Sequence, residues 1–351
     1  MNPEDDVNLA WQNAALKFAQ GRLGPRRRGQ DMHASADFPE LLEEMRSLGF
    51  HALCVAERWQ GLEQEAQALA AVLAPLCRVD ATAGAAVYAH AAAHLALRTG
   101  EEKEDGDLAG YLAEHWLAWP AFHDLAEQDW PLLDATMTLS GQVEMLLIGA
   151  YAGAAVIPAR SPEGMVLVLV DLHAPGVQKS TTVRTLGLSA AGVVDIRFSA
   201  TPVLRVLSQG QERFRDLQPK LALAALAMLG GVMRGSFETA YVYSQERHQG
   251  GGPIKDWGEV RRLLSLMEQQ VCVAESLQMH HRQARDVSGL LHALVHVAER
   301  APEVCSDGIQ LLGGNGYMKD YGQEKRLRDA LQLQCLGGSI SWRRQQLAPK
   351  H

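Results

Sequence analysis

The sequence predicts a mainly helical α+β protein with three domains. We expect an N-terminal helical domain over residues 1–120, a small β-sheet or β-barrel domain over 121–208 and a C-terminal four-helix bundle over 209–351. Two changes of pattern carry this prediction. Apolar residues recur at helical spacing in the first and last thirds of the chain. Between them the chain breaks into short β-prone runs separated by Gly, Pro and Ser turn signals.

The N-terminal domain is expected to contain several helices. Apolar residues at helical spacing begin at Phe38, and Gly49 ends the run. Ala- and Leu-rich stretches over 66–74 and 83–97 are typical of buried helices. Pro75 is expected to mark a break between them.

The middle domain contains four β-prone runs at spacings that predict a small antiparallel sheet or barrel. These runs are 135–139, 145–148, 165–170 and 193–198.

The C-terminal domain is expected to contain long helices. One helix should run from 214 to 247, roughly 45 Å, with Pro219 in its first turn. The further helices are expected over 257–285, 289–300 and 302–312, the last opened by Pro302.

Composition narrows the class of partner. The net charge of −8 predicts no attraction to nucleic acid or to an anionic membrane surface. No window contains the roughly 18 uncharged apolar residues that a membrane span needs, so we expect no such span. We also expect no signal peptide in residues 1–18. Five scattered cysteines without a Cys-x-x-Cys pair fit a reducing, cytoplasmic location.

Four segments carry recognisable motifs. Residues 310–317 read Gln-Leu-Leu-Gly-Gly-Asn-Gly-Tyr and are followed by Arg328-Asp329-Ala330, while 243–254 contain Glu-Arg-His-Gln, three glycines and Pro-Ile. Together with segments 48–62 and 186–203, they resemble the acyl-CoA dehydrogenase family. The resemblance implies that family's three-domain fold, an FAD cofactor and formation of an α,β double bond in an acyl-CoA thioester.

Two of these segments are expected to bind a pyrophosphate. Glycine N–H groups can approach an anion closely because no Cβ intervenes, and an arginine supplies a fixed cation. In the family both elements reach the FAD of a neighbouring subunit. The expected contacts are Arg247, Gln249, Gln310, Gly313, Gly314 and Gly316. In the alternative interpretation the glycines only form a tight turn and Arg247 only pairs with a carboxylate.

The catalytic base of the family is missing. Gly337 stands where the resemblance places the glutamate that removes the α-proton, and glycine cannot accept a proton. Some relatives carry the base on the first long C-terminal helix, but Leu221 and Ala222 occupy that position. Glu212 or Asp216 would serve only if the alignment were shifted. We therefore predict no catalytic residue in this chain.

The flavin-ring motifs of the family are also absent. They should lie in 122–130 and 147–154, and neither segment matches. Gly250 replaces the usual Phe after Gln249, which removes a flat apolar contact. We therefore expect the chain to share a partner's FAD without holding one of its own.

This pattern resembles the shorter, base-less subunit of α2β2 heterotetrameric acyl-CoA dehydrogenases of steroid side-chain degradation. The resemblance implies a catalytic acyl-CoA dehydrogenase partner that binds the acyl-CoA substrate, with an electron-transfer flavoprotein as acceptor. Two alternatives remain: an ordinary homotetramer with a displaced base, and a flavin-free scaffold protein.

No metal site is predicted. His292, His296 and Glu299 share one helix face, but they lack the neighbouring general-base glutamate of a zinc peptidase motif. We expect a solvated or interface face there.

Overall fold

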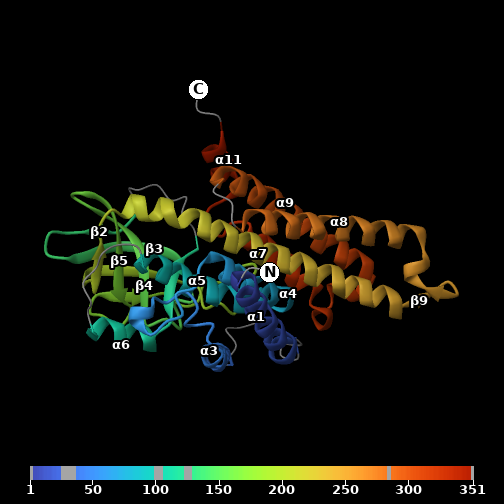
Figure 1. Cartoon of the computed structure of the whole chain (residues 1–351), viewed down its shortest axis with the longest axis horizontal. Helices are drawn as coiled ribbons and strands as arrows, with labels where there is room; N and C mark the ends of the chain where they lie inside the picture. Colours follow the sequence, from blue (N-terminus) through green and yellow to red (C-terminus); the bar gives the residue numbers. More distant parts are fainter. Residues whose placement is uncertain (1–2, 25–36, 99–105, 122–128, 283–285, 349–351) are drawn as a thin grey trace.

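The computed structural model of the chain describes residues 3–24, 37–98, 106–121, 129–282 and 286–348. Helices, a sheet and more helices follow one another in the predicted order, which confirms the predicted fold class. The sheet lies at one end of the molecule, and the helix α7 runs from it to the opposite end (Figure 1).

The N-terminal helices pack around a core rich in Ala and Leu. Pro75 lies inside α4, so the predicted break at this residue was wrong. The helix and its buried side chains continue through Leu76 and Cys77. The break falls at Asp80, whose Oδ1 accepts a hydrogen bond from the Thr82 N–H at 2.9 Å. The elements are α1 Pro3–Phe18, η1 Ala19–Leu23, α3 Phe38–Ser47, η2 Glu57–Trp59, α4 Ala66–Val79, α5 Ala81–Arg98 and α6 Gly106–Glu114.

The middle domain is an eight-stranded sheet in the order β6-β7-β3-β1-β4-β5-β8, with β2 beside β3 and β4. It is not wholly antiparallel, because β1 and β2 run parallel to β4. The first two predicted runs contribute to one bulged strand, β3, and Asp134 caps the turn before it. The strands are β1 Leu117–Pro120, β2 Leu132–Leu133, β3 Thr138–Leu147, β4 Ala154–Ser161, β5 Gly164–Asp171, β6 Val177–Lys179, β7 Val194–Pro202 and β8 Arg205–Leu207.

The C-terminal domain is built around α7, a helix of 37 residues that contacts α4, α5, α8, α9 and α10. The elements are α7 Gly210–Glu246, β9 His248–Gln249, β10 Gly252–Pro253, η4 Ile254–Asp256, α8 Gly258–His281, α9 Val287–Leu312, η5 Gly313–Tyr317, η6 Lys319–Tyr321, α10 Gln323–Leu333 and α11 Ile340–Leu347.

Two proline predictions were wrong in this domain. Helix α7 begins at Gly210, so Pro219 lies inside it and not in its first turn. The predicted helices on either side of Pro302 are one helix, α9. Pro302 has no N–H for the carbonyl of Ala298, and the Gln334 side-chain amide donates to that oxygen instead at 2.7 Å. This replacement satisfies the carbonyl and lets α9 continue.

Helix α7 is a core helix. Among the described residues it is the one helix with the length and mean hydropathy of a membrane span, although Lys220 and Arg234 leave it no run of 18 uncharged apolar residues. However, 89% of its most apolar 18-residue window is buried within the fold. Packing against neighbouring helices therefore accounts for its apolar surface.

Two glycines allow α4 and α7 to approach closely. A Cβ at Gly231 would clash with the carbonyl oxygen of Ala74, and one at Gly235 would clash with that of Arg78. The adjacent Gly230 differs, because its nearest neighbours would lie at ordinary contact distances, 3.9 Å from the Ala274 Cβ and 4.0 Å from the Gln278 Oε1.

These neighbouring glycines make a matched pair for mutation. We expect Gly231→Ala to lower the free energy of unfolding by about 1–3 kcal/mol, because the new methyl group forces two backbones apart. Gly230→Ala should leave stability unchanged or raise it by up to about 1 kcal/mol through its better helix propensity. Denaturant unfolding of both variants tests this, and equal effects would contradict the contact geometry.

A cluster of histidines is buried in the N-terminal domain. The rings of His51 and His90 stack at 4.3 Å between centroids, and His94 lies against His90 at 4.4 Å. Nδ1 of His90 accepts from the Leu117 N–H at 2.9 Å, so Nε2 carries the proton that it donates to the His51 carbonyl at 3.0 Å. Neither ring nitrogen of His94 has a hydrogen-bond partner among the described residues. Burial lowers the pKa of His51 to about 4 and of His94 to about 3, and places that of His90 well below its ordinary value.

The cluster should make the fold sensitive to acid. The unfolded chain takes up protons below about pH 6.5, whereas the folded chain keeps these rings neutral, so stability falls as pH drops from 6.5 toward 4. Each neutral ring contributes a loss of about 1.4 kcal/mol per pH unit. Unfolding curves measured across this range give the free energy of unfolding at each pH. Its slope against pH should be smaller for His94→Leu and unchanged for the exposed His296→Gln. An unchanged slope in His94→Leu would refute this account.

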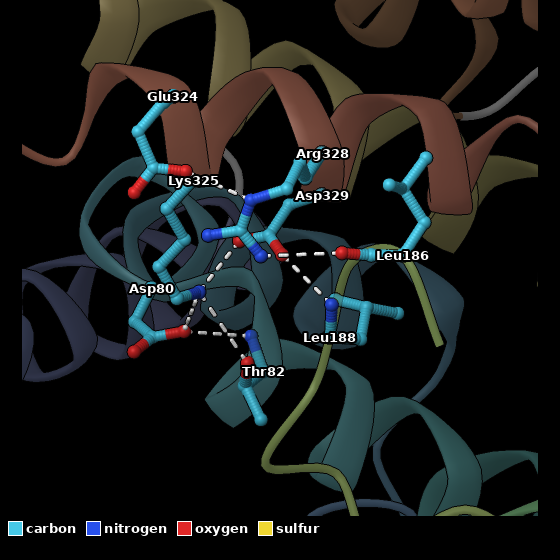
Figure 2. A network of polar contacts seen from close by, with 8 residues as sticks. All are labelled: Asp80, Thr82, Leu186, Leu188, Glu324, Lys325, Arg328 and Asp329. Atoms are coloured by element: carbon cyan, nitrogen blue, oxygen red, sulfur yellow. Dashed lines mark hydrogen bonds and ion pairs between the residues drawn. The ribbon is translucent and has the colours of Figure 1, made fainter. Parts of the chain in front are cut away.

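Three domains meet at one buried ion-pair network (Figure 2). From α10, Lys325 Nζ donates to Asp329 Oδ2 at 2.6 Å and to Asp80 Oδ1, at the junction of α4 and α5, at 3.0 Å. Asp329 Oδ1 also accepts from the Leu188 N–H of the middle domain at 2.8 Å. Burial alone lowers the pKa of Lys325, but Asp329 and then Asp80 raise it above its ordinary value. The amine therefore stays charged at the joint.

The segment Arg328-Asp329-Ala330 is thus structural, and so is the glycine that it faces. A Cβ at Gly187 would clash with the carbonyl oxygen of Arg328. Arg328 Nη1 also donates to the Leu186 carbonyl at 3.2 Å. Only a glycine lets the middle domain lie this close to α10.

We expect Lys325→Met to destabilise the protein by about 3–5 kcal/mol, because it leaves two acids without their buried counter-charge. The exposed pair Arg262–Glu259 supplies the control, and Arg262→Met should leave the unfolding midpoint unchanged. Thermal unfolding measures both. A Lys325→Met protein as stable as the control would show that the network does not hold the domains together.

Candidate functional site

Most of the predicted cofactor contacts line one open cleft. It has a volume of about 590 Å³ and lies where the end of α7, the start of α8 and the end of α9 meet. Five of the six predicted residues line it: Arg247, Gln249, Gln310, Gly313 and Gly314.

Arg247 is placed by the end of α7. Its N–H donates to the Tyr243 carbonyl at 2.9 Å, and its own carbonyl accepts from the Ile254 N–H at 2.8 Å. Its guanidinium is exposed and has no acidic partner within the described part of the chain. Glu259 lines the same cleft but is bound to Arg262. A free cation with several donors therefore faces the cleft.

The glycines of the turn after α9 divide into two kinds. Gly313, with φ of 57°, and Gly314 have open space where a side chain would be, which leaves their backbone accessible to a ligand. Gly316 is buried, and a Cβ there would clash with the Ile309 carbonyl. Its role is thus to close the turn, and it lies outside the cleft lining. Asn315 fixes the turn through a hydrogen bond from its Nδ2 to the Tyr243 hydroxyl at 3.0 Å.

Sequence reasoning missed the aromatic wall of this cleft. Tyr243 and Trp257 both line it. A Cβ at Gly250 would clash with the Trp257 ring, so the indole fills the space beside this glycine. The flat apolar surface lost with the usual Phe is therefore supplied from the residue before α8. An aromatic residue shortly after the glycines was the signal that could have identified it.

The proposed positions of the catalytic base converge on a second cavity of about 200 Å³. Gly337 lines it together with Leu221 and Ala222, so both alternative sites face the same space. None of the lining residues in the described part of the chain is a carboxylate. The lining residues are Tyr88, Gln218, Leu221, Ala222, Leu291, Leu294, Leu336, Gly337, Trp342, Arg343 and Gln346.

The backbone at Gly337 is suited to glycine. Its φ is 74°, and its N–H donates to the Ala121 carbonyl at 2.7 Å. Buried Arg343 donates to the carbonyls of Gln334 and Leu336 just before it. Glu212 and Asp216 are exposed and do not line the cavity. No carboxylate among the described residues lining this cavity can therefore remove a proton there.

The expected flavin-ring segments are used for packing where they are described. Residues 122–128 lie outside the described residues. From Ile148 to Gly153 every backbone N–H donates to a carbonyl of the chain itself. Tyr151 fills the turn and packs against Phe38 at 5.1 Å between ring centroids. This segment has no backbone donor left for an isoalloxazine ring, so it does not fit a flavin.

The histidines considered for a metal are on the surface of α9. His292 and His296 are exposed, and Glu299 pairs with Arg344. Among the described residues no group of three or more His, Cys, Asp or Glu side chains is placed to hold a metal ion.

Two family profiles match the chain on either side of the sheet. The N-terminal domain profile of the acyl-CoA dehydrogenases matches residues 5–106, and their C-terminal domain profile matches residues 220–350. Together they cover more than half of the sequence. The chain belongs to the acyl-CoA dehydrogenase family.

Individual relatives are distant. The probable acyl-CoA dehydrogenase FadE25 of Mycobacterium tuberculosis is 26% identical over 96% of this chain and 92% of its own length. The probable acyl-CoA dehydrogenase YngJ of Bacillus subtilis is 24% identical over 55% of each chain. The structure of butyryl-CoA dehydrogenase from Megasphaera elsdenii matches with a TM-score of 0.86 at 18% identity, covering 97% of both chains. A chain from the electron transferring flavoprotein structure of Acidaminococcus fermentans matches with a TM-score of 0.87 at 19% identity, over 99% of this chain and 97% of its own.

Helix α7 separates the two sites of this acyl-CoA dehydrogenase family member. We call the cavity around Gly337 the degenerate cavity. It adjoins Leu221, and the open cleft adjoins Arg247. These two residues are roughly 40 Å apart along α7 at 1.5 Å per residue. Figure 1 shows the end of α7 that carries β9 pointing away from the sheet. A flavin dinucleotide is too short to span both sites.

Proposed function

We propose that this chain is a non-catalytic subunit of a heteromeric FAD-dependent acyl-CoA dehydrogenase. A catalytic partner binds FAD and the acyl-CoA thioester and forms the α,β double bond. This chain completes the partner's FAD site with Arg247, Gln249, Gln310, Gly313 and Gly314. The observation that carries the proposal is made on the described residues: exposed Arg247 has no acidic partner among them and lies in an open cleft, far from a cavity whose described lining contains no carboxylate.

The cleft has the chemistry of a pyrophosphate site. Arg247 offers a cation with several donors, and the backbone of Gly313 and Gly314 is unobstructed. Trp257 adds a flat apolar face. Bound there, FAD would supply the hydride acceptor of the partner's reaction, and the residues of this chain would only hold its phosphates.

The surface around the cleft is suited to a protein partner. Large apolar side chains are exposed near it, a feature typical of interaction surfaces. They are Tyr241, Val242, Trp257, Tyr317, Met318 and Tyr321. Tyr317 is 74% exposed even though it directly follows the glycine turn. A partner subunit that covers them would bring its FAD to Arg247.

The substrate assignment rests on the resemblance to the steroid-type enzymes. The cavity of about 200 Å³ in this chain is below the usual size of a small-molecule site. A bulky acyl group must then lie in the partner's pocket, and the partner's reduced flavin would pass its electrons to an electron-transfer flavoprotein. This assignment places the complex in lipid or steroid side-chain degradation.

The test is the FAD content of the full chain, alone and after co-expression with a catalytic relative that carries both flavin motifs and the glutamate. We expect no FAD in the chain alone and about one FAD per pair in the complex. Arg247→Ala should weaken FAD binding by the complex about 10- to 100-fold, since a charge-assisted hydrogen bond contributes about 1.5–3 kcal/mol. Flavin absorbance and acyl-CoA dehydrogenation measure both effects.

The matched control is Arg300→Ala, a partly exposed arginine of α9 that is paired with Glu303 and lies outside the cleft. It should change neither FAD content nor activity. A full complement of FAD in the chain alone would favour an ordinary homotetramer with a displaced base. A complex that holds no FAD would favour a scaffold protein.

A further inference from the structure

A third cleft lies on the other side of α7 from the degenerate cavity. It has a volume of about 340 Å³ and is formed by α1, α4, α7 and α8. One wall is apolar and made of short or rigid residues, among them Ala71, Pro75 and Gly230, with Leu16 at its edge. The size is that of a site for one small molecule.

The same cleft is lined by three arginines, and one of them has no counter-charge among the described residues. Arg78 Nε binds Glu238 at 2.6 Å. Arg234 binds Glu275 through Nε at 2.9 Å and Nη2 at 2.6 Å. Arg282 has no acidic partner within the described part of the chain, and its Nε is buried without a hydrogen bond. One positive charge in the cleft is therefore uncompensated.

A buried amide lies beside this charge. Gln278 is only 8% exposed, lines the cleft and makes no hydrogen bond within the described part of the chain. It lies one turn before Arg282 on the same face of α8. Its amide atoms remain accessible from the cleft, where a ligand or water can hydrogen-bond to them. Side chains four residues apart on a helix are neighbours, so the amide and the guanidinium can donate to one oxyanion.

We propose that this cleft binds a small organic monocarboxylate with a short or flat apolar body. The carboxylate would accept from Arg282 and from the Gln278 amide, and its single charge would neutralise the unpaired guanidinium. The apolar body would lie on Ala71, Pro75 and Gly230. No part of the cleft is shared with the FAD cleft, so the proposal does not depend on the function proposed above.

The test uses para-fluorobenzoate with the full chain, followed by fluorine NMR titration. We expect saturable binding, with para-fluorobenzamide and acetate each competing at least 10-fold more weakly than benzoate, since one lacks the charge and the other the apolar body. Arg282→Gln should weaken binding at least 10-fold. Gln278→Leu should weaken it several-fold, and its circular dichroism spectrum verifies that it folds.

Arg262→Gln is the matched control, because Arg262 lies on the same helix but outside the cleft. It should bind the probe like the wild type. Arg247→Ala should also bind it normally, which separates this cleft from the FAD site. No saturable binding, equal binding of benzoate and its amide, or full binding by Arg282→Gln would each overturn the proposal. Tighter binding of phenyl phosphate than of benzoate would do so too, because it would point to a dianion site.

Discussion

The buried charge of Lys325 is the constraint on which the arrangement of domains depends. Its two carboxylates come from α10 and from the junction of α4 and α5, while one of them also holds the middle domain through the Leu188 N–H. Removal of any member leaves an uncompensated charge in a largely buried site, where a lone charge is costly. The Arg-Asp-Ala segment is part of the family resemblance, and in this chain it lies where three domains meet.

Helix α7 places two different sites along its length, one near its start and one at its end. Near its start, Leu221 and Ala222 line a cavity whose described lining contains no carboxylate. At its end, Arg247 follows the helix, and its guanidinium has no acidic partner in the part of the chain that the structure describes. The intervening turns are buried on most sides, and Gly231 and Gly235 let α4 pack directly on the helix backbone. The helix therefore keeps the cleft around Arg247, at its C-terminal end, far from the sheet (Figure 1).

Local pattern was enough for much of the fold. The spacing of apolar residues placed α3, α7 and α8 within a few residues of their bounds, and turn signals located the sheet. Pattern failed at prolines, since Pro75, Pro219 and Pro302 all lie inside helices. In the case of Pro302 the replacement donor is Gln334, more than thirty residues away. A prediction from local sequence does not include this distant donor. It therefore could not show that α9 continues through Pro302.

The sequence by itself determined the family, the order of the domains and the absence of a glutamate at position 337, because these depend only on which residues occur and at what spacing. The tertiary structure alone decided that Gly316 closes a turn while Gly313 and Gly314 stay open, that Trp257 fills the space beside Gly250 and that Arg247 has no acidic partner among the described residues. It also revealed that Gln278 and Arg282 line a third cleft. The clefts that hold these residues are formed by helices far apart in the chain, and only the packed core brings such helices together.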